Sequence, residues 1–204
     1  MRINLPNQIT IARLVLAVIF FVLLGQYDQA APRAALLDVC FVIFLVAALT
    51  DWLDGYLARK QNQVTSLGRM LDPFVDKVLI CGVFVFFCSA TFVGIDCTNV
   101  TGVAPWMVVL IVGRELLVTG LRGFTESRGQ AYGALAFGKL KMVLQSTTAS
   151  VILLLVAHPD GVLGHPAVLT VKTGLIWATV IVTALSMFQY LLRSKDILTE
   201  AARV

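Results

Sequence analysis

Six long apolar runs dominate the chain and limit what it can fold into. A membrane-spanning helix needs about 20 mostly apolar residues, and six segments come close to that length: 9–25, 34–56, 73–93, 105–121, 141–157 and 167–192. Hydrophobic residues make up 58% of the 204 residues and charged residues only 14%, whereas soluble domains contain about 25% charged residues. The chain lacks the polar residues that would cover a soluble globule, so we predict an integral membrane protein.

The apolar runs predict helices rather than strands. Backbone polar groups cannot stay unpaired in lipid, and the runs lack the alternation of a membrane barrel. We therefore predict an all-α polytopic protein with six transmembrane helices in a single domain, residues 1–204. Arg13 interrupts the first run, and no small-residue cleavage pattern follows it, so we expect this segment to be retained rather than removed as a signal peptide.

Lys and Arg residues fall almost entirely on one side of the predicted topology. Six spans place both termini on the same side of the membrane. Of the 16 Lys and Arg residues, only Arg33 and Lys172 fall toward the other side. Because positive residues accumulate in cytoplasmic loops, we predict a cell-membrane protein whose termini and functional face are cytoplasmic.

Four aspartates gather in one stretch of this cationic side. The stretch DWLDGYLARKQNQVTSLGRMLDPFVD, residues 51–76, holds Asp51, Asp54, Asp72 and Asp76 among only 12 acidic residues in the chain. Spacings of three and four residues put each pair on one helical face. The short polar loop between the pairs predicts antiparallel neighbouring helices and a common point for all four carboxylates. Taken alone, Asp72-Pro73 is also typical of an ordinary helix start.

A metal site would remove the repulsion among four carboxylates, which raise one another's pKa when they share a small volume. Oxygen ligands without a nearby Cys or His suit hard ions such as Mg²⁺, Mn²⁺ or Ca²⁺, and four carboxylates suffice for two divalent metal ions. Gly55, Ala58 and Gly68 leave room beside the carboxylates, and Arg59 offers donors that match a phosphate. We predict a metal site that binds a phosphate or pyrophosphate.

The same stretch resembles the signature of the CDP-alcohol phosphotransferase family. All eight fixed positions of that signature are present: Asp51, Asp54, Gly55, Ala58, Arg59, Gly68, Asp72 and Asp76. The resemblance implies a six-helix membrane fold and an enzyme that transfers a phosphoalcohol group from a CDP-alcohol to an acceptor hydroxyl, with release of CMP. It also implies two divalent ions, Mg²⁺ or Mn²⁺.

The resemblance assigns a role to each signature position. The four aspartates would hold the metal ions, and Asp76 would also be the catalytic base that accepts the acceptor's proton. The residues implied to lie against the CDP group are Asp54, Gly55, Ala58, Arg59 and Gly68.

Three further blocks resemble the phosphatidylglycerophosphate synthases, a branch of this family. The first is NLPNQITIARL, in which Asn7, Thr10 and Arg13 lie three apart on one helical face as supporting residues. The others are GRELLVTGLRGFTESRG and GKLKMVLQS, and the latter has Met142 where the family usually has Thr. This resemblance implies CDP-diacylglycerol as the donor and glycerol 3-phosphate as the acceptor.

Basic residues in the last two blocks favour an acceptor that carries phosphate. Arg114 and Arg122 lie eight apart on one stripe of the fourth segment, and Lys139 and Lys141 lie at the cytoplasmic start of the fifth. A cluster of unpaired cations beside a metal site suits glycerol 3-phosphate. Basic residues at cytoplasmic helix ends are also expected from topology alone. Inositol phosphate, phosphatidylglycerol and serine remain alternative acceptors.

Two other classes of protein fit parts of the pattern. A divalent cation transporter could use the carboxylates, but transporter sites lie near the bilayer midplane, often between inverted repeats, and the chain has no visible repeat. A helical scaffold would explain the small residues but not four clustered aspartates. Members of the family are often dimers, so a homodimer is an assembly to be tested, and no nucleic-acid partner is expected.

Overall fold

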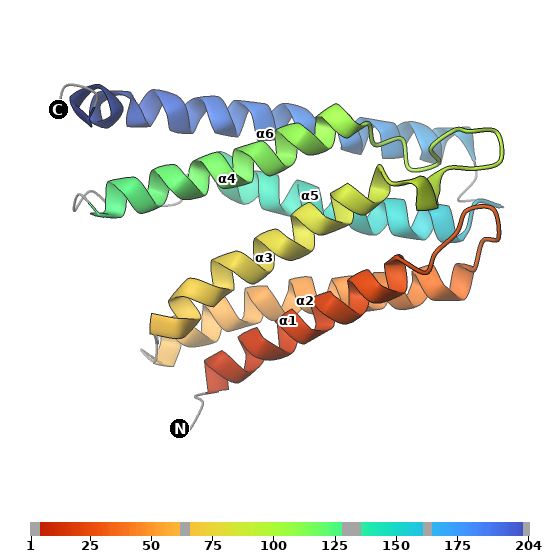
Figure 1. Ribbon diagram of the computed structural model, residues 1–204, viewed down its shortest axis with the longest axis horizontal. Helices are drawn as coiled ribbons and strands as arrows, with labels where there is room; N and C mark the ends of the chain where they lie inside the picture. Colours follow the sequence, from red (N-terminus) through yellow and green to blue (C-terminus); the bar gives the residue numbers. More distant parts are fainter. Residues whose placement is uncertain (1–4, 62–65, 128–135, 161–164, 202–204) are drawn as a thin grey trace.

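The computed structural model contains six α-helices that run along one elongated bundle (Figure 1). It describes residues 5–61, 66–127, 136–160 and 165–201. The helices are α1 (Leu5–Leu24), α2 (Ala34–Gln61), α3 (Ser66–Phe87), α4 (Pro105–Ser127), α5 (Ala136–Ala157) and α6 (Pro166–Ala201). A short 3-10 helix, η1 (Ala90–Phe92), lies between α3 and α4. The predicted all-α class is confirmed for the described residues.

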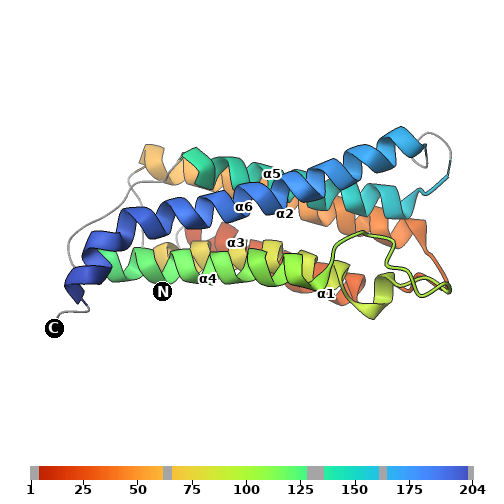
Figure 2. The same cartoon turned by 90° about the horizontal axis from the view of Figure 1, so that it is seen from above.

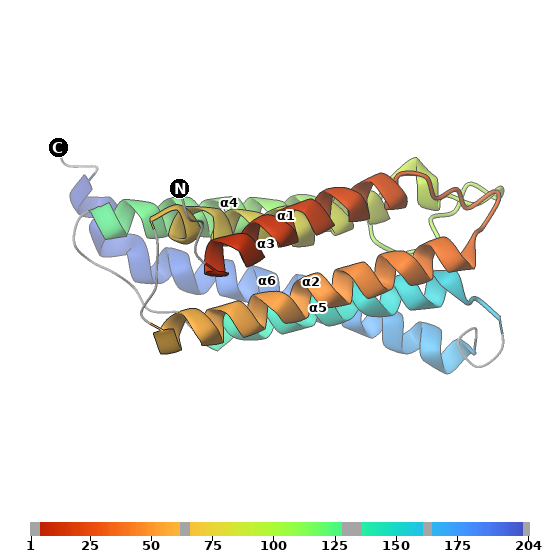
Figure 3. The same cartoon turned by 90° about the horizontal axis from the view of Figure 1, so that it is seen from below.

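The helices pack in a closed ring rather than in chain order. Helix α1 packs against α2 and α3, α2 against α5, α5 against α6, α6 against α4, and α4 against α3. Figures 2 and 3 show successive helices running in opposite directions. The starts of α1, α3 and α5 therefore lie at the same end of the bundle as the ends of α2, α4 and α6. We call this the aspartate end, and the opposite end, which holds residues 88–104, the loop end.

Aromatic and aliphatic side chains fill the interior of the ring. Phe20 and Phe44 are fully buried, and their ring centres lie 5.8 Å apart where α1 meets α2. Helices α1 and α3 approach closely because residue 82 is glycine. A Cβ atom at Gly82 would lie 2.2 Å from Cζ of Phe21, a separation that no side chain can adopt. The small residue thus sets the distance between these two helices.

Large apolar side chains also cover the outside of the bundle. They are exposed along α1, α2, α4 and α6, for example Val22, Leu49, Val109 and Phe188. In the described part of the chain, two stretches are long and apolar enough to cross a bilayer, Leu140–Ala157 and Pro166–Arg193. Shorter apolar stretches lie in α1, α2 and α3: Thr10–Leu24, Ala34–Thr50 and Lys77–Phe87. Apolar helices with apolar outer faces suggest a membrane protein.

Every helix continues past its predicted apolar run at the aspartate end. Helix α2 ends at Gln61 rather than at Tyr56, and α4 ends at Ser127 rather than at Leu121. Helix α3 starts at Ser66, so Pro73 lies inside the helix and the interpretation of Asp72-Pro73 as a helix start is wrong. The apolar runs indicated only the part of each helix that lipid can cover, whereas backbone hydrogen bonding continues into polar sequence.

The loop end is closed by a network of hydrogen bonds. Thr101, which is fully buried, donates from Oγ1 to the Phe87 carbonyl at 2.8 Å, and its hydroxyl accepts from the Val103 amide at 3.1 Å. Asn99 Nδ2 donates to the same Phe87 carbonyl at 2.8 Å. These bonds satisfy the last carbonyl of α3 after the helix ends. Lys172 also belongs to this end, as predicted, and donates from Nζ to the Val100 carbonyl at 2.9 Å.

Candidate active site

The four predicted metal ligands lie in two helices that meet at the aspartate end. Asp51 and Asp54 are inside α2, and Asp72 and Asp76 are inside α3. The backbone is helical at all four positions, so each pair shares one helical face, as the spacing predicted. Helices α2 and α3 run in opposite directions (Figure 1) and are in contact. The four side chains lie outside the described part of the structure, so their convergence stays a prediction.

The residues predicted to contact CDP belong to the same two helices. Gly55, Ala58 and Arg59 lie in the last turns of α2, and Gly68 lies in the first turn of α3. Their side chains also lie outside the described residues, and so does the side chain of Asn7 in α1. Among the side chains that the structure does describe, no three His, Cys, Asp or Glu residues come together to hold a metal ion. The predicted aspartate site is not part of that set.

Thr10 and Arg13 lie on the inner face of α1, near the aspartate end. They are 2% and 1% exposed. Helix α1 packs only against α2 and α3 among the described elements, so this buried face belongs to the same group of helices as the aspartates. The prediction that Thr10 and Arg13 share one face is confirmed, and their supporting role stays a prediction.

A buried ion cluster, made of Arg114, Glu115 and Lys141, joins α4 to α5. Arg114 Nη1 donates to Glu115 Oε1 at 3.1 Å, and Lys141 Nζ donates to the same oxygen. The three side chains are only 5–8% exposed. Two cations and one carboxylate leave a net charge of +1 inside the bundle. A buried charge without a partner is costly, so the cluster can accept a further anion.

Arg114 is held in place from two more helices. Its Nη2 donates to Ser186 Oγ on α6 at 2.5 Å, and its guanidinium carbon lies 5.5 Å from the centre of the Tyr190 ring. On α5, a Cβ atom at Gly138 would lie 3.9 Å from Arg114 Nη2. Arg114 is therefore fixed among α4, α5 and α6, as a binding residue must be, although its Nε has no hydrogen-bond partner among the residues that the structure describes.

The structure changes the predicted arrangement of cations in two respects. Arg114 and Lys141 were expected to be unpaired, but both bind Glu115. Arg114 and Arg122 were expected on one stripe, but Arg122 is exposed whereas Arg114 is buried. Eight residues rotate a helix by about 80° beyond two turns, which explains the difference. The side chain of Lys139 lies outside the described residues, and the assignment of all four cations to an acceptor phosphate stays a prediction.

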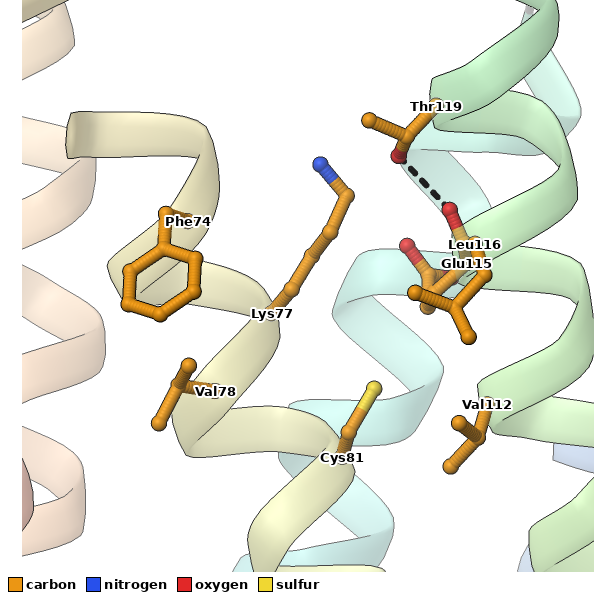
Figure 4. Close-up of a pocket in the computed structure, with 8 residues that line it drawn as sticks. All are labelled: Phe74, Lys77, Val78, Cys81, Val112, Glu115, Leu116 and Thr119. Atoms are coloured by element: carbon orange, nitrogen blue, oxygen red, sulfur yellow. Dashed lines mark hydrogen bonds between the residues drawn. The ribbon is translucent and has the colours of Figure 1, made fainter. Parts of the chain in front are cut away.

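A cavity of about 340 Å³ separates α3 from α4 next to the ion cluster (Figure 4). Lys77, the residue after Asp76, extends from α3 toward α4, and Glu115 lines the opposite wall. The complete lining is Phe74, Lys77, Val78, Cys81, Val112, Glu115, Leu116 and Thr119. The cavity therefore connects the turn of α3 that carries Asp76 with the helix that carries Arg114.

Three residues of this region had no role in the sequence predictions. Glu115 was visible as a charged residue in an apolar run, next to Arg114, and that position was the signal for an ion pair. Ser186 and Tyr190 lie four residues apart on α6. Their spacing indicates a common face, but only the packing of α6 against α4 identifies Arg114 as their partner.

Comparison with known proteins identifies the family of this site. The sequence model described as CDP-alcohol phosphatidyltransferase matches residues 3–185, which include the four aspartates and the ion cluster. The chain belongs to the CDP-alcohol phosphatidyltransferase family. The predicted family resemblance is thereby confirmed, and with it the prediction that the protein is an enzyme of this class.

Individual members of the CDP-alcohol phosphatidyltransferase family resemble the chain over most of its length. A CDP-diacylglycerol–glycerol-3-phosphate 3-phosphatidyltransferase of Bacillus subtilis (strain 168) is 34% identical over 203 residues, covering 92% of this chain and 93% of the relative. A protein of the same name from Rickettsia bellii (strain RML369-C) is 37% identical over 152 residues, 74% of this chain and 75% of the relative. A cardiolipin synthase (CMP-forming) of Oryza sativa subsp. japonica is 31% identical, covering 88% of this chain and 56% of the relative.

Proposed function

We propose that the protein transfers the phosphatidyl group of CDP-diacylglycerol to glycerol 3-phosphate, giving phosphatidylglycerophosphate and CMP. The Bacillus and Rickettsia relatives are named for this reaction. The family signature, the N-terminal block and both basic blocks all lie within the matched residues 3–185. The reaction belongs to phospholipid biosynthesis, because its product is a phospholipid precursor built on a lipid donor.

The enzyme spans the membrane six times in this proposal, with its termini and active site in the cytoplasm. Support comes from the apolar outer faces of α1, α2, α4 and α6 and from the segregation of basic residues toward the aspartate end. At the loop end, Trp106 and Trp177 are about half exposed with ring centres 5.9 Å apart. Exposed Trp side chains are enriched at the boundary between lipid and water.

The donor binds where α2 and α3 meet. Asp51, Asp54, Asp72 and Asp76 form an all-oxygen set that fits two divalent ions, Mg²⁺ or Mn²⁺, and these ions would offset the charge of the CDP diphosphate. Gly55, Ala58 and Gly68 leave space for the nucleotide beside the helices, and Arg59 pairs with phosphate oxygens. The lipid tails of the donor stay in the bilayer and enter between helices.

Asp76 acts as the base in a single displacement. Its carboxylate accepts the proton of the acceptor's primary hydroxyl while that oxygen forms a bond to the phosphorus that carries the diacylglycerol. The bond from this phosphorus to the bridging oxygen of the diphosphate breaks, and CMP leaves with the bonding electrons. Lys77, which follows Asp76, and Glu115 line the same cavity, so the acceptor has a space between the base and the ion cluster.

The net positive charge of the ion cluster is the observation that selects a phosphorylated acceptor. Arg114 and Lys141 share one carboxylate, and the remaining charge is offset when the phosphate of glycerol 3-phosphate binds. Serine carries no phosphate and would leave this charge without a partner. Arg122 and Lys139 lie further toward the aspartate end and attract the anion before it binds.

The proposal is tested by offering purified protein CDP-diacylglycerol and Mg²⁺ with one acceptor at a time. The acceptors are glycerol 3-phosphate, inositol phosphate, serine and phosphatidylglycerol, and the lipid product is identified by mass spectrometry. We expect phosphatidylglycerophosphate and CMP in equal amounts with glycerol 3-phosphate. Product formation only with one of the other three acceptors would reassign the acceptor, and no product with any acceptor would overturn the proposed function.

A further inference from the structure

A layer of buried polar side chains lies next to the ion cluster, deeper in the bundle. Gln145 on α5 and Thr183 on α6 are both fully buried. Both side-chain atoms of the Gln145 amide and the Thr183 hydroxyl have no partner in the described part of the structure. An unpaired buried polar group costs several kcal/mol in an apolar medium. Two such residues together indicate that a ligand or water completes the layer.

Packing of α5 against α6 puts Gln145 and Thr183 at the same level. One turn deeper, Thr148 and Thr179 face each other with their hydroxyl oxygens 2.8 Å apart. Gln145 lies three residues before Thr148, and Thr183 lies four residues after Thr179, on antiparallel helices. Both steps are close to one helical turn and stay on the same face. Gln145 and Thr183 therefore form the next layer of the same interface.

The ion cluster lies one turn further toward the aspartate end on both helices. Lys141 is four residues before Gln145, and Ser186, which binds Arg114, is three residues after Thr183. One turn corresponds to about 5.4 Å along a helix axis. A ligand at the ion cluster is thus within reach of the Gln145 amide and the Thr183 hydroxyl.

The unpartnered atoms around this position match a phosphate group. Arg114 Nε, Gln145 Nε2 and Thr183 Oγ1 are all hydrogen-bond donors, and none of the three has a partner within the described ranges of the chain. A phosphate monoester carries a charge of about −1.5 to −2 at neutral pH, more than the net +1 of the ion cluster offsets. Neutral donors can share the remaining charge without adding a further buried cation.

We infer that Gln145 and Thr183 complete the binding site for the acceptor's phosphate and determine the preference for a phosphorylated acceptor. This inference rests on the proposed function, since it names residues of the same acceptor site. Gln145 Nε2 and Thr183 Oγ1 donate to phosphate oxygens that Arg114 and Lys141 bind from the other side. The Gln145 Oε1 atom accepts a hydrogen bond from the protonated oxygen of the phosphate or from a water molecule, and this bond orients the amide.

Thr183→Val and Gln145→Leu test the inference, because each removes the donor and keeps a similar side-chain volume. We expect the KM for glycerol 3-phosphate to rise about 10-fold or more, as for the loss of a hydrogen bond to a charged group. The KM for CDP-diacylglycerol and the melting temperature should stay close to wild type. Thr183→Ser keeps the hydroxyl and should restore the KM for glycerol 3-phosphate to within about 2-fold of wild type.

Thr179→Val is the matched control, with the same substitution one turn away on the same helix. It removes the partner of Thr148, so we expect a lower melting temperature and an unchanged KM for glycerol 3-phosphate. If Thr183→Val does not fold, the KM for glycerol 3-phosphate of Gln145→Leu tests the inference. A wild-type KM for glycerol 3-phosphate in the donor-removing variants, with changes in melting temperature alone, would mean that the layer holds only ordered water and would overturn the inference.

A second readout separates binding from turnover. Glycerol 3-phosphate should raise the melting temperature of the wild type and of Thr183→Ser, because a ligand stabilises the folded state that binds it. This rise should be absent in Thr183→Val. Failure of the wild type to form any phosphatidylglycerophosphate would overturn the proposed function itself. Normal wild-type activity with a wild-type KM in both donor-removing variants would overturn only the inference about Gln145 and Thr183.

Discussion

The two ends of the bundle differ in how their buried polar groups are hydrogen-bonded. At the loop end, Thr101 is buried with its hydroxyl bonded to the Phe87 carbonyl and the Val103 amide. Toward the aspartate end, Gln145 and Thr183 are equally buried, but their polar atoms have no partner among the described residues. Burial alone therefore does not separate structural from functional polar residues. The difference lies in whether the fold itself supplies the hydrogen-bond partner.

Charge follows the same division. The loop-end cation Lys172 is half-buried and donates to the backbone carbonyl of Val100. Arg114 and Lys141 share a single carboxylate and keep a net positive charge inside the bundle. We attribute the first arrangement to folding and the second to substrate binding. Substitutions at the two ends of the bundle test this assignment.

Asp76→Asn should nearly abolish turnover. Removal of a general base lowers the rate by about 10²- to 10⁴-fold, while CDP binding should remain largely intact because three aspartates are unchanged. The measurement is CMP release by the purified enzyme, together with CDP binding. Asp96→Asn is the control, since Asp96 is an exposed loop-end residue whose carboxylate accepts a hydrogen bond from the Thr98 hydroxyl at 2.7 Å. A near wild-type rate in Asp76→Asn would remove Asp76 from the role of base.

Arg114→Ala should weaken binding of the acceptor. Loss of a charged hydrogen bond costs about 1.5–3 kcal/mol, which corresponds to a rise of about 10- to 100-fold in the KM for glycerol 3-phosphate. Lys172→Ala removes a cation from the loop end and should leave this KM unchanged. Equal KM values for wild type and Arg114→Ala would place acceptor binding elsewhere in the protein.

Thr101→Val should affect stability but not substrate binding. The substitution leaves the Val103 amide without its partner and weakens the end of α3. We expect a loss of about 1–3 kcal/mol in the free energy of unfolding, measured by thermal or denaturant unfolding in detergent. The KM for both substrates, determined on folded protein, should match the wild type. A selective rise in the KM for glycerol 3-phosphate would contradict the assignment of the loop end to folding and of the aspartate end to substrate binding.

Local features of this fold could be predicted from the sequence, and contacts between helices could not. The spacing of Asp51 and Asp54 is a property of one helix, and the helical backbone at these positions agrees with it. The pairing of Lys141 with Glu115 joins α5 to α4. The helices follow one another around the ring in the order α1, α2, α5, α6, α4, α3, which differs from their order in the chain. The role of Thr183 could not be predicted for the same reason, because its position beside Gln145 depends on the register of α5 against α6.

The helix ends illustrate a second limit. Hydropathy located the apolar part of α2 and α3, but it ended α2 at Tyr56 and began α3 at Pro73, whereas the helices continue to Gln61 and begin at Ser66. These extra turns carry Ala58, Arg59, Gly68 and Asp72, which belong to the family signature. The chemistry was therefore predicted from the spacing of polar residues, while the length of the helices that hold them followed only from the structure.

Binding of Mn²⁺ by the purified protein, in the presence of CDP-diacylglycerol, tests most directly whether the aspartates of α2 and α3 form one metal site. We expect two ions per chain in the wild type and in Asp96→Asn, and a loss of bound ions in both Asp51→Asn and Asp72→Asn, which lie on different helices. The absence of bound Mn²⁺ in the wild type, or two ions retained in both of these variants, would contradict a shared site.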